Sequence, residues 1–273
     1  MDIVPHTGIH ESMTSEDYHA YPAWSRSQLV DLKNSERLFY HKHILKNMNT
    51  EPSPQMIMGE CVHLKILEPH LFEKRVAVHP KFNRATKVGK AEYEEFLLSH
   101  AAFPLWISEE NNAIAEEMAN NLRKRMHQDT GDLLDTANME WSFMWEEDGL
   151  PFKCRPDGFI DGLGFDIKTS KDASYRSFQM DCVKRGYFLQ AAMIRRGLRA
   201  NGTNLERFVF CCVENVEPFS TSIYIVDQEA MAYGDLVFES LKVKLAEVLK
   251  SDEFHDNPLK IMTVPQWALQ EDV

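Results

Sequence analysis

The sequence predicts an α/β protein in which a mixed central β-sheet is flanked by helices, with helical additions at its N-terminal end. Alternating runs meet at Asp161-Gly162, a two-residue signal for a β-hairpin turn. A helical stretch over about residues 174–199 follows, and strand-like runs come next at residues 207–213 and 220–226. A helix that crosses between strands is typical of a sheet that is at least partly parallel.

Length and composition predict one large domain. The 273 residues are 44% hydrophobic, enough for a substantial core. We expect a single domain over residues 1–273, with an N-terminal helical and irregular region (1–55), a core (56–226), and a C-terminal helix with a tail (227–273). The net charge of −12 argues against a uniformly basic DNA-coating protein, but residues 168–199 carry eight basic and two acidic residues, a local charge of +6.

The cysteine spacing and the absence of three sequence features argue against several classes of protein. The five cysteines have no metal-site spacing, and an odd number without a signal peptide predicts a reducing cytoplasm. No apolar run reaches membrane-spanning length, so we expect no membrane partner. There is no G-x-x-x-x-G-K-[ST] loop, which leaves an ATP-driven motor unsupported.

Capping residues mark the starts of four predicted helices. The second of these helices carries apolar residues at helical spacing as far as Ile44. The caps, in chain order, are Thr14 or Ser15, Ser25 or Ser27, Ser108 and Asp227. Residues 139–145 alternate in polarity and predict a strand ahead of the hairpin.

A further helix is predicted over about residues 56–67. Gly59 and His63 are four residues apart and share one face of it, where the small glycine allows close approach of another element. His63 taken alone also suits an interfacial histidine with satisfied hydrogen bonds. Residues 80–93 are basic and are expected to form a mobile loop, either solvated or in contact with phosphates.

The hairpin brings acidic residues together. If the two turn residues form the loop, Asp157 faces Asp166 and Arg155 faces Lys168 across the strands. Two facing carboxylates repel each other unless a cation lies between them. Two alternatives remain at this point. A looser four-residue loop would place Asp157 opposite Lys168, and a hairpin whose acids face water would need no cation.

These residues resemble a known signature. Asp157, followed by Asp166-Ile167-Lys168, resembles the PD-(D/E)xK nuclease signature. Gly59-x-x-x-His63, continuing to Glu68, is similar to the early motif of the RecB-type branch of that superfamily. Together with Gln190, the ordered set resembles the RecE-like (exonuclease VIII) nuclease family and related phage proteins over about residues 8–226.

One motif departs from the family pattern. Gln190 matches the first position of Q-x-x-x-Y, but Ile194 stands where the tyrosine is expected. Tyr187, one turn before Gln190, can cover the same helix face. The cysteine cluster of the iron–sulfur relatives is also missing, so we expect no iron–sulfur cluster.

The resemblance implies a metal-dependent nuclease site. Mg²⁺, for which Mn²⁺ can substitute, would be held by Asp157, Asp166 and the Ile167 carbonyl, joined by His63. Lys168 would position or deprotonate the attacking water or stabilise charge, and Gln190 would orient water or substrate. Glu140 is a weaker candidate for a ligand or an orienting group. Predicted DNA-binding residues are Arg155, Lys87, Lys90, Lys171, Arg195 and Arg196.

The family implies a Mg²⁺-dependent 5′→3′ exodeoxyribonuclease that acts on duplex DNA with free ends and exposes a 3′ single strand for a RecT-like annealing protein. It also implies a homo-oligomer, most simply a tetrameric ring, in a bacterial cytoplasm and encoded by a phage or prophage. Two alternatives stay open: a structure-specific or restriction-like endonuclease of the same fold, and a catalytically inactive DNA-binding protein. The intact set of Asp157, Asp166 and Lys168 argues against the inactive protein.

Overall fold

A computed structural model describes residues 7–48, 52–160, 162–259 and 261–264. Its central element is a mixed five-stranded sheet with the strand order β10-β9-β8-β7-β4. Strands β8 and β9 are parallel and the other pairs are antiparallel, as predicted for a sheet with a helical crossover. The strands are β4 (Asn138–Met139), β7 (Gly158–Ile160), β8 (Leu163–Ser170), β9 (Arg207–Glu214) and β10 (Thr221–Val226).

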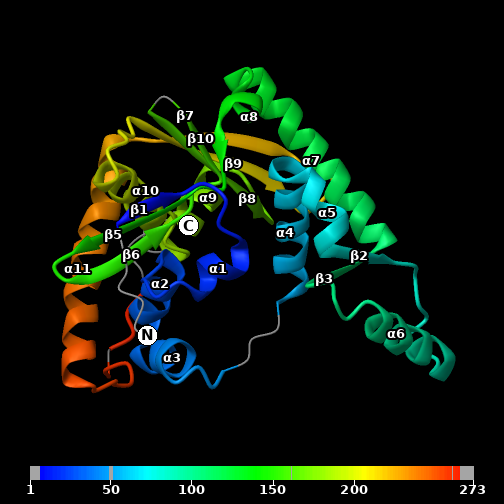
Figure 1. The fold of residues 1–273 in the computed structure, drawn as a ribbon, viewed down its shortest axis with the longest axis horizontal. Helices are drawn as coiled ribbons and strands as arrows, with labels where there is room; N and C mark the ends of the chain where they lie inside the picture. The colour runs from blue at the N-terminus through cyan, green and yellow to red at the C-terminus, as the bar shows by residue number, and fades with distance from the viewer. Residues whose placement is uncertain (1–6, 49–51, 161, 260, 265–273) are drawn as a thin grey trace.

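Both faces of this sheet are covered by helices (Figure 1). On one side lie α10 (Tyr187–Ala200) and α11 (Gln228–Ser251), and on the other lie α4 (Pro54–Leu67) and α7 (Glu109–Thr130). Strand β9 shows why two layers form, because its apolar run alternates between the two cores. Phe208, Phe210 and Cys212 face one core, whereas Val209, Cys211 and Val213 face the other.

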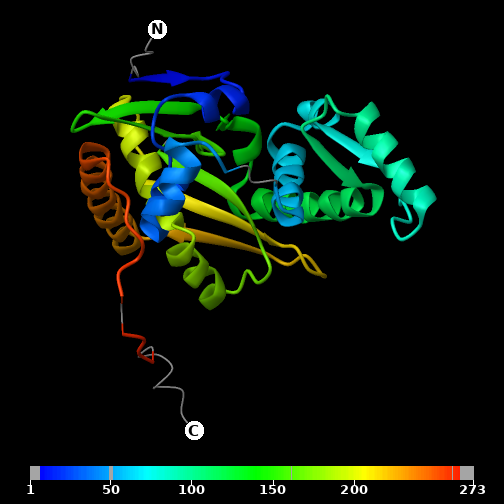
Figure 2. The same cartoon turned by 90° about the horizontal axis from the view of Figure 1, so that it is seen from below.

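Two smaller sheets extend this core. A three-stranded antiparallel sheet has the order β1-β5-β6, formed by β1 (Gly8–His10), β5 (Ser142–Glu147) and β6 (Leu150–Cys154). A parallel pair, β2 (Val76–His79) and β3 (Leu105–Ser108), supports α6 (Lys87–Ser99). Figure 2 shows that β2, β3 and α6 form a lobe that projects from the body, and we call residues 76–108 the arm.

The remaining helices are short. They are α1 (Ser15–Ala20), α2 (Arg26–Asn34), α3 (Glu36–Phe39), the π-helical turn η1 (Tyr40–Ile44), α5 (Pro69–Arg75), α8 (Leu133–Thr136) and α9 (Tyr175–Lys184). None of the described helices is long and apolar enough to cross a membrane.

The helix caps are confirmed. Thr14 accepts a hydrogen bond from the Asp17 amide, and Ser108 and Asp227 cap α7 and α11 in the same way. Ser25 begins α2 through a capping box. Each of these signals is local, so the sequence alone defines where the helix begins.

Four element predictions are corrected, three of them by breaks in the backbone. The helix expected to run to Ile44 stops at Ser35, whose extended backbone begins α3. Gly186, with φ 71°, divides the expected 174–199 helix into α9 and α10. Glu140, with φ 56°, interrupts the expected 139–145 strand. The loop predicted over residues 80–93 is helical from Lys87 onward.

Candidate active site

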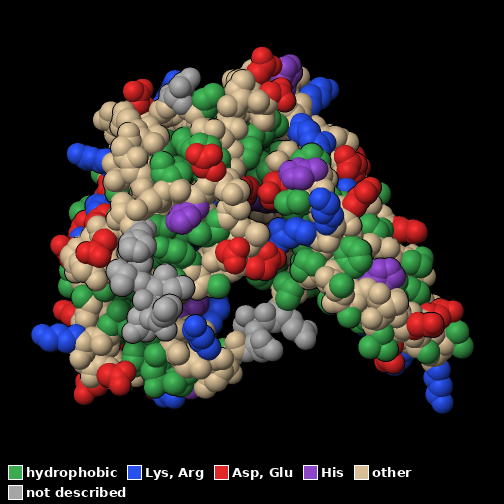
Figure 3. Space-filling model, in the orientation of Figure 1, with side chains coloured by type: hydrophobic (Ala, Val, Ile, Leu, Met, Phe, Trp, Pro, Cys, Tyr) green, Lys and Arg blue, Asp and Glu red, His purple; other side chains and the backbone are tan. Residues whose placement is uncertain are grey.

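A pocket of about 890 Å³ opens at one end of the hairpin, between the core and the helices that lead into the arm. One side is formed by residues 11–27, which we call the N-terminal wall, and the opposite side by α4 and α5. In Figure 3 a recess opens on this face of the molecule, with acidic, basic and histidine side chains along its border. The predicted hairpin acids lie at its floor.

The hairpin has the register predicted from a two-residue turn. Ile160 pairs with Leu163 and Gly158 pairs with Phe165, which excludes the looser four-residue loop. Asp161 lies outside the described residues. One step beyond the ladder, an Asp157 carboxylate oxygen accepts a 2.5 Å hydrogen bond from the Ile167 amide, so this acid faces β8 beside Asp166.

Both hairpin acids are buried. Asp157 and Asp166 are only 7% and 2% exposed, so the alternative of acids facing water is wrong. Burial and, next, the charge of Asp166 raise the pKa of Asp157 to about 6, although His63 and Lys168 oppose the shift. A site that resists two negative charges in this way favours a cation.

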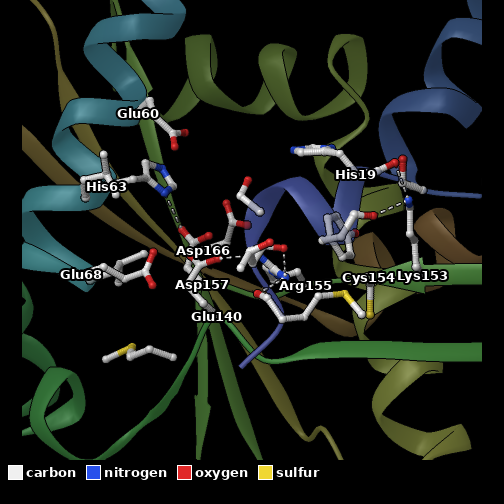
Figure 4. A pocket seen from close by; sticks show the side chains of 18 of the residues that line it. His19, Glu60, His63, Glu68, Glu140, Lys153, Cys154, Arg155, Asp157 and Asp166 are labelled. Atoms are coloured by element: carbon white, nitrogen blue, oxygen red, sulfur yellow. Dashed lines mark hydrogen bonds and ion pairs between the residues drawn. The ribbon is translucent and has the colours of Figure 1, made fainter. Parts of the chain in front are cut away.

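Helix α4 brings His63 to these acids. His63 Nδ1 lies 3.4 Å from an Asp157 oxygen, and Nε2 lies 2.9 Å from the Ile167 carbonyl oxygen. Gly59 makes this approach possible, because a Cβ there would lie 3.2 Å from the Thr169 hydroxyl of β8. Figure 4 shows His63 pointing from α4 toward Asp157 and Asp166. His63 therefore belongs to the site and is not only an interfacial histidine.

Glu140, the weaker candidate from the sequence, is the third member of this cluster of candidate metal ligands. Its carboxylate, a His63 ring nitrogen and an Asp157 oxygen all lie within 4.8 Å of one another. Its left-handed backbone is unusual for a residue other than glycine, and its amide donates a 3.1 Å hydrogen bond to the Asp157 carbonyl. Burial, followed by the charge of Asp157, raises the pKa of Glu140 well above its usual range.

The donor set fits a hard divalent cation. Two carboxylates and one imidazole nitrogen converge, with a second buried aspartate beside them, and oxygen-rich sets of this kind suit Mg²⁺ or Mn²⁺. The raised pKa values point the same way, since a bound cation would offset the burial and the like charge that disfavour the ionised acids. The Ile167 carbonyl contacts His63 here, so these two predicted ligands also contact each other.

Asp166 is held by the other predicted catalytic groups. Lys168 Nζ donates to one of its oxygens, and Gln190 Nε2 donates to the other at 2.5 Å. Lys168 also lies 4.7 Å from the ring centroid of Tyr187, which therefore shares the site with Gln190. Ile194 lines the same pocket without a hydroxyl group.

Arg26 also lies in the pocket, although no role was predicted for it from the sequence. Its guanidinium donates to the Gln190 side-chain oxygen at 3.3 Å and to the Arg185 carbonyl at 3.2 Å. Its position between two serines in a stretch that resembles the family was the available signal. It links the start of α2 to the helix that carries Gln190.

Arg155 is not opposite Lys168, which corrects the predicted pairing. Strand β6 ends at Cys154 and belongs to a different sheet from β7, so the chain leaves the ladder between them. The Arg155 guanidinium donates to Ser142 Oγ at 2.8 Å and to two carbonyls of the N-terminal wall, and lies 3.7 Å from Glu140. The structure thus places this predicted DNA-binding residue in contacts within the protein.

We call the candidate metal ligands His63, Glu140 and Asp157, with Asp166 beside them, the metal cluster. The other predicted DNA-binding residues lie outside it. Lys87 and Lys90 are exposed on α6 of the arm, and Lys171 is exposed just after β8. Arg195 and Arg196 lie on α10 and form ion pairs with Asp235 of α11, and Arg196 also pairs with Glu147 and Glu239.

Three features define a nuclease of the PD-(D/E)xK type. They are a buried acidic pair at the end of a hairpin, a lysine two residues after the second acid, and a mixed sheet between helical layers. The chain belongs to the family described as "PDDEXK-like domain of unknown function" (DUF3799), whose model matches residues 25–258. This confirms the resemblance drawn from the hairpin motif. No curated protein matches the sequence.

Solved structures include a protein that shares this fold. The crystal structure of a candidate exonuclease from Eubacterium rectale is similar with a TM-score of 0.61 and 15% identity, and the match covers 96% of this chain and 99% of that one. An alkaline exonuclease from Laribacter hongkongensis matches with a TM-score of 0.34 and 14% identity, over 88% of this chain and 97% of that one. The first likeness shows a shared fold, and nothing rests on the second.

Proposed function

We propose that this protein is a Mg²⁺-dependent 5′→3′ exodeoxyribonuclease that degrades one strand of linear duplex DNA. One observation carries the proposal: Asp157, Asp166 and Lys168 meet His63 and Glu140 in a single pocket beside the sheet. The family supports a phosphodiesterase, and the similarity to the candidate exonuclease from Eubacterium rectale supports action from a DNA end.

The residues of the chain have separable roles in hydrolysis. His63, Glu140 and Asp157, with Asp166 beside them, would hold Mg²⁺, which supplies positive charge where negative charge develops on the phosphate. Lys168 Nζ is fixed by Asp166 and is available to orient the attacking water or to donate a hydrogen bond to the phosphate.

Gln190 controls the position of Asp166. Its amide nitrogen donates to the Asp166 carboxylate while its oxygen accepts from Arg26, so the side chain is held at both ends. A carboxylate fixed in this way can keep Lys168 aligned with the substrate through the reaction. Gln190 is therefore proposed as a positioning group that acts through Asp166.

An acidic protein needs local basic surfaces to hold DNA. The net charge of −12 repels duplex at long range, and salt screens this repulsion within about 10 Å at 0.1 M. Lys87, Lys90 and Lys171 are exposed and available for phosphates, whereas Arg195 and Arg196 would first have to exchange their ion pairs. We propose that a homo-oligomer, most simply a tetrameric ring, gathers these surfaces around one duplex, and that the 3′ strand passes to a RecT-like annealing protein.

The proposal is tested with linear duplex labelled at either the 5′ or the 3′ end, and with covalently closed circles, each with and without Mg²⁺. We expect early release of the 5′ label, retention of the 3′ label in single strands, and no reaction with closed circles or without metal. Rapid cutting of closed circles would favour the endonuclease. Binding without cleavage of any substrate would favour the inactive DNA-binding protein. Sedimentation of a monomer at micromolar concentration would reject the ring.

A further inference from the structure

Arg75, the last residue of α5, lines the same pocket as the metal cluster. Its side chain is 20% exposed, and its Nε atom is buried without a hydrogen-bond partner in the described part of the chain. Its NH2 group lies 3.4 Å from a Glu60 oxygen and 3.7 Å from a Glu16 oxygen. Both distances exceed the roughly 2.7–2.9 Å of a well-formed hydrogen bond between charged groups. A buried guanidinium donor without an acceptor leaves this arginine with hydrogen-bonding capacity that the described protein atoms do not use.

The other lysine and arginine side chains that line the pocket, within the described residues, are already engaged. Lys153 donates to three carbonyl oxygens of the N-terminal wall at 2.6–3.2 Å, and Arg155 donates to two more. Lys168 donates to Asp166, and Arg26 donates to two acceptors on the chain around α10. Arg75 differs because, within the part of the chain that the structure describes, its charge is opposed only by two loosely placed carboxylates.

The position of Arg75 suits a phosphate beside the reacting one. Glu60 lies one turn before His63 on the same face of α4 (Figure 4). Three residues of an α-helix advance about 4.5 Å, and Arg75 contacts Glu60, so its guanidinium lies close to the metal cluster. A DNA strand whose scissile phosphate sits at the cluster would bring a neighbouring phosphate to this side. The planar fork of arginine matches phosphate geometry.

Glu16 reaches Arg75 from the opposite side of the pocket. It lies on α1 in the N-terminal wall, and its side chain is 70% exposed. An exposed ion pair at 3.7 Å contributes little to stability, so Glu16 can leave Arg75 when a stronger anion arrives. The carboxylate thus stands where a phosphate oxygen would bind.

We propose that Arg75 binds a backbone phosphate next to the scissile one, and that Glu16 contacts Arg75 in the free protein and is displaced by DNA. This inference rests on the proposed nuclease function, since it needs a DNA strand in the pocket. It predicts opposite effects for the two side chains. Loss of Arg75 removes a phosphate contact, whereas loss of the Glu16 charge removes a competitor.

The test measures DNA affinity by fluorescence anisotropy in Mg²⁺, using a labelled linear duplex and a Lys168→Ala background that prevents cutting. Arg75→Gln should weaken binding about tenfold, and should make the slope of log K against log salt shallower by about 0.7–0.9, the value for one lost phosphate contact. Glu16→Gln should tighten binding about twofold to fivefold. The Arg75→Gln/Glu16→Gln double variant should bind like Arg75→Gln alone, because the two side chains act on one another.

Matched variants separate this site from general charge effects. Arg37→Gln removes an arginine from an exposed ion pair with Asp256, and Glu229→Gln removes an exposed acid at the start of α11. Neither should change the salt slope. Thermal unfolding establishes that each variant is folded, and Arg75→Lys, which keeps the charge but not the fork, should fall between wild type and Arg75→Gln.

Three outcomes decide the matter. The inference is overturned if Arg75→Gln weakens binding no more than Arg37→Gln, or if Glu16→Gln keeps its full effect in the Arg75→Gln background. In either case cleavage of linear duplex by the wild-type protein would leave the proposed function standing. If the wild-type protein neither binds nor cleaves DNA, the proposed function fails and this inference fails with it.

Discussion

Two clusters of charged side chains in the described part of the protein differ in balance. Between α10, α11 and β5, Arg196 pairs with Asp235, Glu147 and Glu239 at 2.7–2.9 Å, and Lys242 lies 2.9 Å from Glu239. Burial opposes it, but hydrogen bonds to nearby acids raise the pKa of Lys242, so its positive charge is stabilised. In this α10–α11 cluster each charge has a partner, and the cluster joins elements of the fold.

The metal cluster at the pocket floor is unbalanced. Burial raises the pKa values of both Glu140 and Asp157, and nearby like charge adds to each shift: the charge of Asp157 acts on Glu140, and the charge of Asp166 acts on Asp157. The protein bears this cost at a position where the backbone of Glu140 is itself strained. The contrast teaches that a balanced cluster serves the fold, whereas a cluster left with excess like charge is prepared for a ligand. The difference between the two clusters can be measured as the Mg²⁺-induced thermal stabilisation that remains when a residue of one cluster or the other is replaced.

The largest effect should follow removal of a hairpin acid. Mg²⁺ at a hundred times its dissociation constant should stabilise the wild-type protein by about 2.7 kcal/mol, because it binds only the folded state. Asp157→Ala or Asp166→Ala should abolish this gain together with nuclease activity, as followed by calorimetry and by digestion of labelled duplex. Activity that survives in either variant in the presence of EDTA would refute the site assignment.

Lowering the pH should weaken the Mg²⁺-induced stabilisation of the wild-type protein without any substitution. Asp157 has a folded-state pKa of about 6, above its usual 3.8, so the metal-free fold loses stability as the pH rises through this range and the buried acid ionises. Mg²⁺ binds the ionised form, so the metal-induced gain should be small at pH 5 and complete above about pH 7. Thermal melts at fixed Mg²⁺ across this range test the prediction. A gain that is equal at pH 5 and pH 8 would contradict it.

Lys168→Ala should have little effect on the Mg²⁺-induced stabilisation. Lys168 donates to Asp166 but supplies no ligand, so metal binding should persist while turnover falls by at least about a hundredfold. His63→Ala is the informative companion, because loss of a ligand should shift the Mg²⁺ requirement upward. If calorimetry shows that Lys168→Ala loses metal as fully as Asp166→Ala, the roles of Lys168 and His63 have been assigned wrongly.

The sequence predicted the parts of this site that depend on local signals. The Asp161-Gly162 signal in the sequence predicted the register of the hairpin, and that register brings Asp157 beside Asp166. Gly59 and His63 were one helical turn apart and share a face, as expected for a helix that packs closely on a strand. Helix caps were equally local. In each case a few adjacent residues determine the geometry.

The contributions missed by the sequence come from distant segments. Lys153 donates a hydrogen bond to the carbonyl of Tyr18, 135 residues away, and no local sequence pattern at either residue predicts this contact. Glu140 gained its place because a left-handed residue turns the chain between two sheets, whereas polarity alternation predicted an uninterrupted strand. Arg75 lies at the end of an ordinary helix, and its role depends on partners on α1 and α4. Such contacts follow from the assembled fold.

The smallest effect on the metal gain should come from the balanced cluster. Arg196→Ala removes one ion-pair partner from each of Glu147, Asp235 and Glu239 at the α10–α11 contact. The free energy of unfolding should fall by about 1–2 kcal/mol. This value is reduced because the Arg196 side chain is 22% exposed. The Mg²⁺-induced gain should equal that of wild type, since no predicted metal ligand is changed. Arg37→Ala is the control, because its exposed pair with Asp256 should contribute less than about 1 kcal/mol. Calorimetry with and without Mg²⁺ measures both quantities, and a lost metal gain in Arg196→Ala would show that the two clusters are coupled through the fold.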